Sequence, residues 1–231
     1  MTLTLDHIRM TFDGHEVLRD VTVHVDDGRF VSLIGRSGCG KSTLLRVAAG
    51  LIEPTAGTVR ADADHDMAFG FQDARLVPWI RLWDNVTLGL PGRRTERRQL
   101  ALDALARVGL ADHADAWPGE LSGGQAQRAS LARAIVRQPK LLLLDEPFGA
   151  LDALTRLDMQ DLLAHLQAEQ QWTILMVTHD IPEAARLSDR ILVLADGTIG
   201  TIVDVDRTDM DDEGLPRDHE AIERRLRAAL R

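Results

Sequence analysis

The chain of 231 residues has no tyrosine, one cysteine (Cys39), and an aromatic content of only 4%. A single cysteine excludes an intrachain disulfide, which is typical of proteins in a reducing compartment. No run approaches the ~18 consecutive apolar residues of a membrane helix, so we expect no transmembrane span. Asp6, His7 and Arg9 interrupt the apolar stretch that an export signal requires at the N-terminus. If the protein serves a membrane process, another polypeptide must cross the bilayer.

Positive charge is also scarce. The sequence holds 27 Lys and Arg against 36 Asp and Glu, a formal net charge of −9. General nucleic-acid binders usually present a basic surface, so we expect no nucleic-acid partner. The hydrophobic fraction of 45% and the charged fraction of 27% are ordinary for a globular domain. The length fits one well-cored domain with room for an inserted subdomain.

Short apolar runs alternate with helical patterns along most of the chain. Strands are predicted at residues 3–8, 21–25, 30–34, 58–61, 67–71, 141–144, 173–178, 190–194 and 198–203. Helices are predicted at residues 42–49, 154–169 and 221–230, with Pro182 in the first turn of another. This alternation indicates an α/β fold, in which helices wrap a mainly parallel sheet.

Between residues 73 and 139 the pattern becomes helical. An apolar stripe follows the i, i+3, i+4, i+7 spacing of an amphipathic helix at Ala101, Ala104, Leu105 and Val108. A second helix is expected to begin with Ser122 as its N-cap and to run to about residue 137, before Pro139. We therefore predict an inserted α-helical subdomain.

The whole chain, residues 1–231, is predicted to be one domain. Its nucleotide-binding core comprises about residues 1–72 and 140–203, and the helical subdomain spans about residues 73–139. The remaining residues, about 204–231, are expected to form an acidic linker and a C-terminal helix. Six acidic residues lie between positions 204 and 213, so this linker is expected to be solvated.

A glycine-rich segment follows the predicted strand at residues 30–34. Residues 35–42, GRSGCGKS, match the G-x-x-x-x-G-K-[ST] pattern of a phosphate-binding loop. Glycines let successive backbone N–H groups point at phosphate oxygens, and the following helix adds its positive end. Lys41 supplies a point charge to the β- and γ-phosphates, and the Ser42 hydroxyl is a magnesium ligand. The predicted nucleotide-binding residues here are Gly35, Ser37, Gly38, Cys39, Gly40, Lys41, Ser42 and Thr43.

Two acids follow the four leucines at residues 141–144. A buried strand that ends in two carboxylates can place Asp145 at magnesium, directly or through water, and let Glu146 polarise the attacking water. Paired acids at a strand end are also common as solvated loop ends. The phosphate loop earlier in the chain favours the catalytic interpretation.

The pentapeptide LSGGQ at residues 121–125 lies between the phosphate loop and the acidic strand end. With these motifs and Gln72, Asp152 and His179 in the same order, the chain resembles the ATP-binding subunits of ABC transporters over about residues 2–200. The resemblance implies a P-loop NTPase core with antiparallel N-terminal strands and an inserted α-helical subdomain. It also implies ATP and Mg²⁺ as cofactors and two copies that close on two shared ATP molecules.

The resemblance implies further residue roles. Ser122 and Gly124, with the helix behind them, would contact the γ-phosphate of the ATP bound by the opposite protomer, and Gly123 and Gln125 are predicted to bind nucleotide with them. Gln72 would sense magnesium and the γ-phosphate and report to the membrane partner, and His179 would hold the γ-phosphate and the attacking water. Asp152 would lie across the dimer interface. The predicted catalytic residues are Lys41, Gln72, Glu146 and His179, and the predicted magnesium ligands are Ser42, Gln72 and Asp145.

These subunits usually stack the adenine on an aromatic residue, often tyrosine, which this chain lacks. Phe12, just before Asp13 and Gly14, is the natural substitute, with a core phenylalanine as the alternative. Cys39 is interpreted as a small residue that fits the loop, with a redox role as the alternative.

Segments 71–79 (FQDARLVPW), 117–120 (WPGE) and 145–152 (DEPFGALD) resemble the importer branch for nitrate, aliphatic sulfonates and taurine. Expected partners are a second copy, transmembrane permease subunits and, indirectly, a periplasmic or extracellular binding protein, with the chain at the cytoplasmic face of the membrane. The surface around Arg75, Trp79 and Trp83 is expected to dock a short permease helix, unless both tryptophans pack inside the subdomain.

Two alternatives stay open from the sequence. An exporter or lipoprotein-release ATPase would have the same fold. A non-transport ABC protein fits less well, because repair types carry a long coiled coil whereas Lys41 and Leu121 are only 80 positions apart. Translation types usually carry two such domains in one chain.

Overall fold

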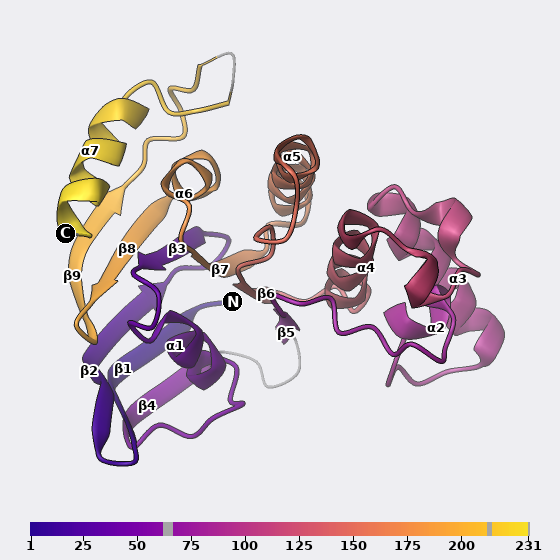
Figure 1. Ribbon diagram of the computed structural model, residues 1–231, viewed down its shortest axis with the longest axis horizontal. Helices are drawn as coiled ribbons and strands as arrows, with labels where there is room; N and C mark the ends of the chain where they lie inside the picture. The colour runs from indigo at the N-terminus through magenta and orange to yellow at the C-terminus, as the bar shows by residue number, and fades with distance from the viewer. Residues whose placement is uncertain (62–66, 212–213, 231) are drawn as a thin grey trace.

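The computed structural model describes residues 1–61, 67–211 and 214–230 (Figure 1). Its strands are β1 (Leu3–Phe12), β2 (His15–Val25), β3 (Phe30–Gly35), β4 (Ala56–Ala61), β5 (Met67–Gly70), β6 (Leu141–Asp145), β7 (Thr173–Thr178), β8 (Arg190–Ala195) and β9 (Thr198–Asp204). Its helices are α1 (Lys41–Ala48), α2 (Leu82–Val86), α3 (Arg94–Arg107), α4 (Gly123–Ile135), α5 (Ala153–Gln170), α6 (Ile181–Leu187) and α7 (His219–Ala229). Two 3₁₀ turns, η1 (Ala111–His113) and η2 (Pro118–Glu120), complete the elements.

The central sheet has six strands in the order β5-β6-β7-β3-β8-β9. The first five run parallel and β9 is antiparallel to β8, as the predicted mainly parallel sheet requires. The carboxyl ends of β5, β6, β7 and β3 therefore share one edge of the sheet. In open α/β sheets that edge is where ligands bind.

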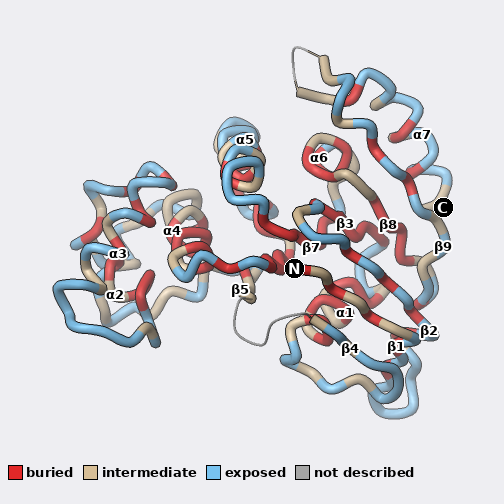
Figure 2. The backbone as a smooth tube through the Cα atoms, turned by 180° about the vertical axis from the view of Figure 1, so that it is seen from behind, coloured by how far each residue is buried: buried red, intermediate tan, exposed pale blue. Residues whose placement is uncertain are grey.

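Residues of β6 alternate between two hydrophobic cores. Leu141 and Leu143 join the core around α1 and the N-terminal strands, whereas Leu142 and Leu144 join the core under α4 and α5. A strand covered on both faces needs an unbroken apolar sequence, which explains the four leucines. Figure 2 shows buried backbone concentrated in β3, β7 and β8 and on the inner side of α4.

A second sheet of three antiparallel strands, β2-β1-β4, packs over α1. Leu44 and Leu45 of α1 are fully buried between this sheet and the central sheet. The predicted antiparallel N-terminal strands are thus present, and β2 begins at His15, earlier than predicted. The helix that follows the phosphate loop is held from both sides.

Helices α2, α3 and α4 form a lobe beside the central sheet (Figure 1). The predicted apolar stripe of α3 is buried: Ala101 and Leu105 have no exposed surface, and Val108 caps the helix. Helix α4 begins after Ser122, as predicted, but ends at Ile135, because the chain turns at Gln138 with φ of +50° before Pro139. Within the described ranges, no helix combines the length and apolar character needed to cross a membrane.

The C-terminal segment corrects one expectation. The predicted linker is not wholly solvated, because Val205 is buried against β8 and α7, and Arg207 donates to the carbonyl of Leu187. Asp212 and Glu213, two of its six acids, lie outside the described residues. The segment is anchored because β9 extends to Asp204 and brings the following residues onto the core.

Candidate functional site: the carboxyl ends of the parallel strands

The phosphate loop connects β3 to α1 and is closely packed. A Cβ atom at Gly35 would lie 2.5 Å from the carbonyl oxygen of Leu194 and 2.6 Å from Cys39 Sγ, so only glycine fits there. Gly40 has φ of +105°, and a Cβ atom there would lie 2.9 Å from Leu18 Cδ2. The core therefore fixes the shape of the loop.

Lys41, the first residue of α1, is 6% exposed. Its Nζ donates to the carbonyl oxygens of Gly35 at 2.8 Å and Arg36 at 3.1 Å, so the ammonium group lies inside the curl of the loop. No side chain caps the N-terminus of α1 and its first turn holds no acid. Free helical N–H groups beside a lysine are suited to an anion such as a phosphate chain.

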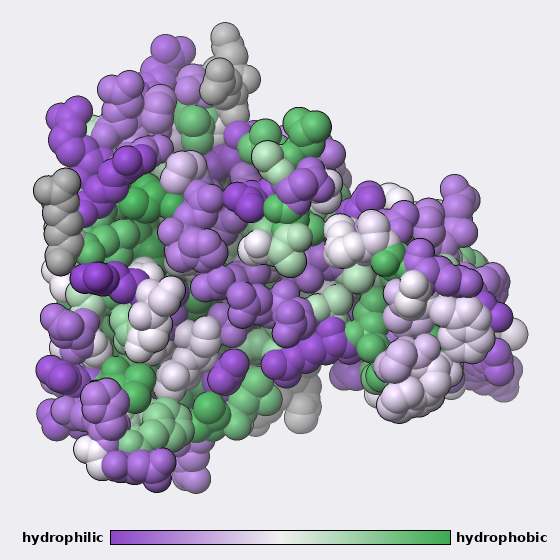
Figure 3. Space-filling model, viewed as in Figure 1, coloured by the Kyte–Doolittle hydropathy of each residue, from purple (hydrophilic) through white to green (hydrophobic). Residues whose placement is uncertain are grey.

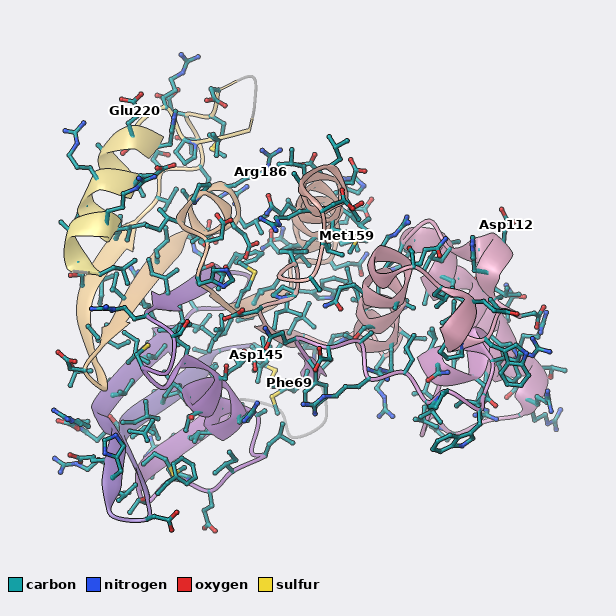
Figure 4. All side chains as sticks on the ribbon, viewed as in Figure 1. Phe69, Asp112, Asp145, Met159, Arg186 and Glu220 are labelled. Carbon is teal, nitrogen blue, oxygen red and sulfur yellow. The ribbon has the colours of Figure 1, made fainter. Side chains whose placement is uncertain are left out.

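Ser42 and Asp145 meet between α1 and β6. The Ser42 hydroxyl donates to Asp145 Oδ1 at 2.8 Å, and Arg46 lies 4.0 Å from Oδ2 of the same carboxylate. Asp145 is 4% exposed (labelled in Figure 4). A hydroxyl and a carboxylate oxygen at this separation are a donor set that fits Mg²⁺ beside a bound phosphate.

Side chains from two other segments of the chain contact the Glu146 carboxylate. Gln72 Nε2 donates to Glu146 Oε2 at 3.3 Å, and His179 Nδ1 lies 3.1 Å from the same oxygen. Glu146 has φ of +45°, which is unfavourable for a residue with a side chain, and its N–H donates to the Val177 carbonyl at 2.9 Å. This turn directs the carboxylate between the ends of β5 and β7. A carboxylate, an imidazole and an amide are thereby placed together beside the phosphate loop.

The signature pentapeptide opens α4. Ser122 is the N-cap: its Oγ accepts from Gln125 N at 3.2 Å, and its N–H donates to Gln125 Oε1 at 2.9 Å. This reciprocal pair is a capping box. Gly123 has open space around it, and a Cβ atom at Gly124 would lie 3.1 Å from Thr155 Cγ2 at the start of α5.

The structure does not bring the signature to the phosphate loop of the same chain. Helix α4 belongs to the helical lobe, and α1 lies across the central sheet from it (Figure 1). Asp152 is the N-cap of α5 and accepts from the backbone N–H and the hydroxyl of Thr155, at 3.0 Å and 2.7 Å. These hydrogen bonds lower the pKa of the Asp152 carboxyl. The signature at the start of α4 is therefore remote from the phosphate loop at the start of α1 within one chain.

Phe12 ends β1 and is 43% exposed, so the alternative of a core phenylalanine is wrong. Its role as an adenine platform stays a prediction. Cys39 is half-buried in the core beside α1 and is the one free cysteine of the chain.

The expected docking surface needs one correction. Trp79 is 76% exposed and Arg75 is exposed, with its guanidinium 4.0 Å from the Phe71 ring centroid. Trp83, however, is 2% exposed and packs inside the lobe, because α2 turns its ring toward α3. The predicted docking surface would therefore consist of Arg75 and Trp79 without Trp83. Pale, weakly hydrophilic side chains gather over the α2 side of this lobe in Figure 3.

Sequence reasoning missed the residues that hold the segment after Gln72. Asn85 is fully buried and accepts from Val77 N at 2.7 Å while its Nδ2 donates to the Val77 carbonyl at 3.1 Å. Arg133 of α4 donates to the carbonyls of Ala74 and Arg75 at 2.6 Å and 2.8 Å. Neither residue belongs to a recognisable motif: Asn85 bonds a carbonyl and an N–H eight residues earlier, and Arg133 bonds carbonyls nearly sixty residues earlier.

The fold and the site define a P-loop ATPase whose candidate catalytic groups lie at the carboxyl ends of parallel strands. Residues 18–149 match the family model described as "ABC transporter". The chain is 52% identical over 205 residues to the aliphatic sulfonates import ATP-binding protein SsuB of Pseudomonas putida, covering 86% of this chain and 75% of that protein. It is 51% identical over 210 residues to the SsuB protein of Pseudomonas entomophila, covering 88% and 77%.

Solved structures of ABC proteins are similar to this chain in fold. The dimeric ATP-binding cassette MJ0796, in a post-hydrolysis state bound to ADP and Pi, has a TM-score of 0.80 and 33% identity, covering 88% of this chain and 98% of that one. The protein cbiO1 of Clostridium perfringens, part of an ABC transporter complex, has a TM-score of 0.78 and 26% identity, covering 87% and 88%. This chain belongs to the ABC transporter family and is an ATPase coupled to transport. The predicted family, fold and enzyme class are confirmed.

Proposed function

We propose that this chain hydrolyses ATP to drive import of a small organic anion of the aliphatic sulfonate class. The hydrolytic part rests on one observation: Gln72 and His179, from separate segments, both contact Glu146 Oε2 beside the phosphate loop. Import and substrate are supported by the Pseudomonas relatives, which are described as import proteins for aliphatic sulfonates. Taurine and nitrate are the other small anions predicted.

In this proposal each residue of the site has a chemical role. Lys41 exchanges its bonds to loop carbonyls for the β- and γ-phosphates, and Ser42, Asp145 and Gln72 hold magnesium. When bound there, the metal ion would neutralise part of the negative charge of the phosphates. Glu146 accepts a proton from the attacking water, and His179 positions that water and the γ-phosphate. Phe12 offers its exposed ring to the adenine.

The site is completed by a second copy of the chain. Ser122, Gly123, Gly124 and Gln125 of one copy would face the phosphate loop of the other, with Asp152 at the same interface. Support comes from the separation of α4 and α1 within one chain and from the dimeric state of the MJ0796 cassette.

The partners in this proposal are paired transmembrane permease subunits, docked at Arg75 and Trp79, and indirectly an extracellular or periplasmic binding protein. The chain would then lie peripherally at the cytoplasmic face of the membrane. An exporter of the same fold is less favoured because the Pseudomonas relatives are described as import proteins. Co-purification with a permease and a binding protein distinguishes the two, and uptake of an alkanesulfonate in a deletion strain tests the substrate.

Mixing two inactive chains tests the shared site. Neither a Ser122→Arg nor a Lys41→Ala homodimer should hydrolyse ATP appreciably. In the heterodimer both defects fall on one composite site, and the other site keeps an intact lysine and an intact serine. Recovery of partial activity is expected if one site can act alone. A Ser122→Arg homodimer with near wild-type turnover would show that the signature is outside the hydrolytic site.

A further inference from the structure

Arg156 joins two loops that carry residues of the proposed site. It lies in the first turn of α5, and its guanidinium donates to the Leu151 carbonyl at 3.1 Å, one residue before Asp152. The same guanidinium lies 3.5 Å from Asp180 Oδ2, one residue after His179. One planar cation therefore bonds both the Asp152 loop and the His179 turn.

Asp180 is itself fixed. Its Oδ1 accepts from the Glu183 N–H at 3.0 Å, which caps α6, and its own N–H donates to Thr178 Oγ1 at 3.0 Å. The side chain and the backbone of Asp180 are therefore bonded to residues on both sides of His179.

A second contact joins the same helices one turn further along α5. Gln160, four residues after Arg156 and thus on the same helix face, donates to Glu183 Oε2 at 3.3 Å. Gln160 and Glu183 are both buried, at 3% and 4% exposure. Helix α5 therefore holds the first turn of α6 at two successive positions.

We infer that Arg156 is a positioning residue that couples the Asp152 loop to the His179 turn, and so links the two nucleotide sites of the dimer. The inference rests on the proposed function, in which Asp152 borders the partner's site while His179 serves its own. An arginine suits the task because its rigid fork offers separate donors to a carbonyl and a carboxylate at once. A displacement of the Asp152 loop by the partner then reaches His179 through one side chain.

Two variants separate coupling from folding. Arg156→Met keeps the length of the side chain and removes every donor, whereas Arg156→Lys keeps one charge for Asp180 and loses the fork. Arg186→Met is the matched control: Arg186 also joins α6 to α5, through Asp161 at 2.8 Å, yet contacts neither loop (labelled in Figure 4). Steady-state ATPase kinetics give kcat, KM and the Hill coefficient, and NMR of the ATP-free protein follows the His179 ring, assigned by its loss in His179→Ala.

We expect kcat of Arg156→Met to fall at least about tenfold with KM little changed, because a misplaced catalytic group slows chemistry more than binding. The Hill coefficient should fall toward 1 in both Arg156 variants, since cooperativity requires coupled sites. The His179 signals should shift in Arg156→Met and stay near wild type in Arg156→Lys. Arg186→Met should match the wild type throughout.

A folded Arg156→Met with wild-type kcat and Hill coefficient overturns the inference. If that variant does not fold, a wild-type Hill coefficient in Arg156→Lys overturns it instead. A Hill coefficient of 1 in the wild-type protein also contradicts the coupling. The proposed function fails separately, on full activity of the Ser122→Arg homodimer.

Discussion

The buried carboxyl group of Glu183 should make the stability of this protein depend on pH near neutrality. Burial against α5 and β7 and, to a smaller extent, the charge of Asp180 raise its pKa from 4.5 to about 7, against the opposing effect of hydrogen bonds from Thr178 and Gln160 and of the Arg156 charge. Because the folded state holds this proton more tightly than the unfolded state, the group stabilises the fold fully below pH 4.5. That contribution is lost as pH rises through about 7.

The size of the loss follows from the shift. Each pKa unit corresponds to about 1.4 kcal/mol, so a rise from 4.5 to about 7 amounts to about 3 kcal/mol between acidic and mildly alkaline pH. Glu183→Gln removes the titration and keeps an oxygen that can accept from Gln160. Relative to the wild type, the variant should therefore gain about 2.5 kcal/mol of stability between about pH 5 and pH 8, since part of the full change already occurs below pH 5.

Urea unfolding of the ATP-free protein, followed by circular dichroism across this pH range, measures the effect. Subtracting the free energy of unfolding of the wild type from that of the variant removes the contribution of the other titrating groups. Glu220→Gln, at an exposed position on α7, is the matched control for replacing a carboxylate by an amide without burial. Parallel stability curves for wild type and Glu183→Gln would refute the argument that burial holds this proton.

Three further predictions concern the site. Glu146→Gln keeps the shape of the side chain but cannot accept a proton, so turnover should fall ~10²–10⁴-fold with ATP binding intact; turnover within about threefold of wild type would exclude Glu146 as the base. Lys41→Ala removes the cation inside the phosphate loop and should weaken ATP binding measured by calorimetry, and an unchanged affinity would contradict the assignment of the loop. The double substitution Arg75→Ala and Trp79→Ala should reduce uptake or permease co-purification more than basal ATPase activity. Trp117→Ala is its control, and normal uptake by a folded double variant would disprove docking there.

The order of elements could be predicted because it depends on local pattern. The four leucines at residues 141–144 indicate a strand that is buried on both faces. Ser122 and Gln125 form a capping box, which by itself predicts that a helix begins there. The phosphate loop is likewise formed by consecutive residues, so its sequence motif is enough to predict phosphate binding.

Other features depend on contacts between distant segments and could not be read from a pattern. The burial of Trp83 was mispredicted because two tryptophans in one short segment look alike in sequence, and only packing of α2 on α3 decides which one faces water. Arg133 left no signal for the same reason, because the carbonyls that it bonds belong to a segment nearly sixty residues earlier.

The sequence by itself determined the class of protein, the phosphate loop, the acidic strand end and the signature, since each is a contiguous set of residues with its own local geometry. Only the tertiary structure decided that Gln72 and His179 reach one oxygen of Glu146, and that Arg156 spans the Asp152 loop and the His179 turn. The physical reason is that parallel strand order brings the ends of distant segments to one edge of the sheet. Hydrogen-bond partners across that edge are fixed by packing, which no local spacing records.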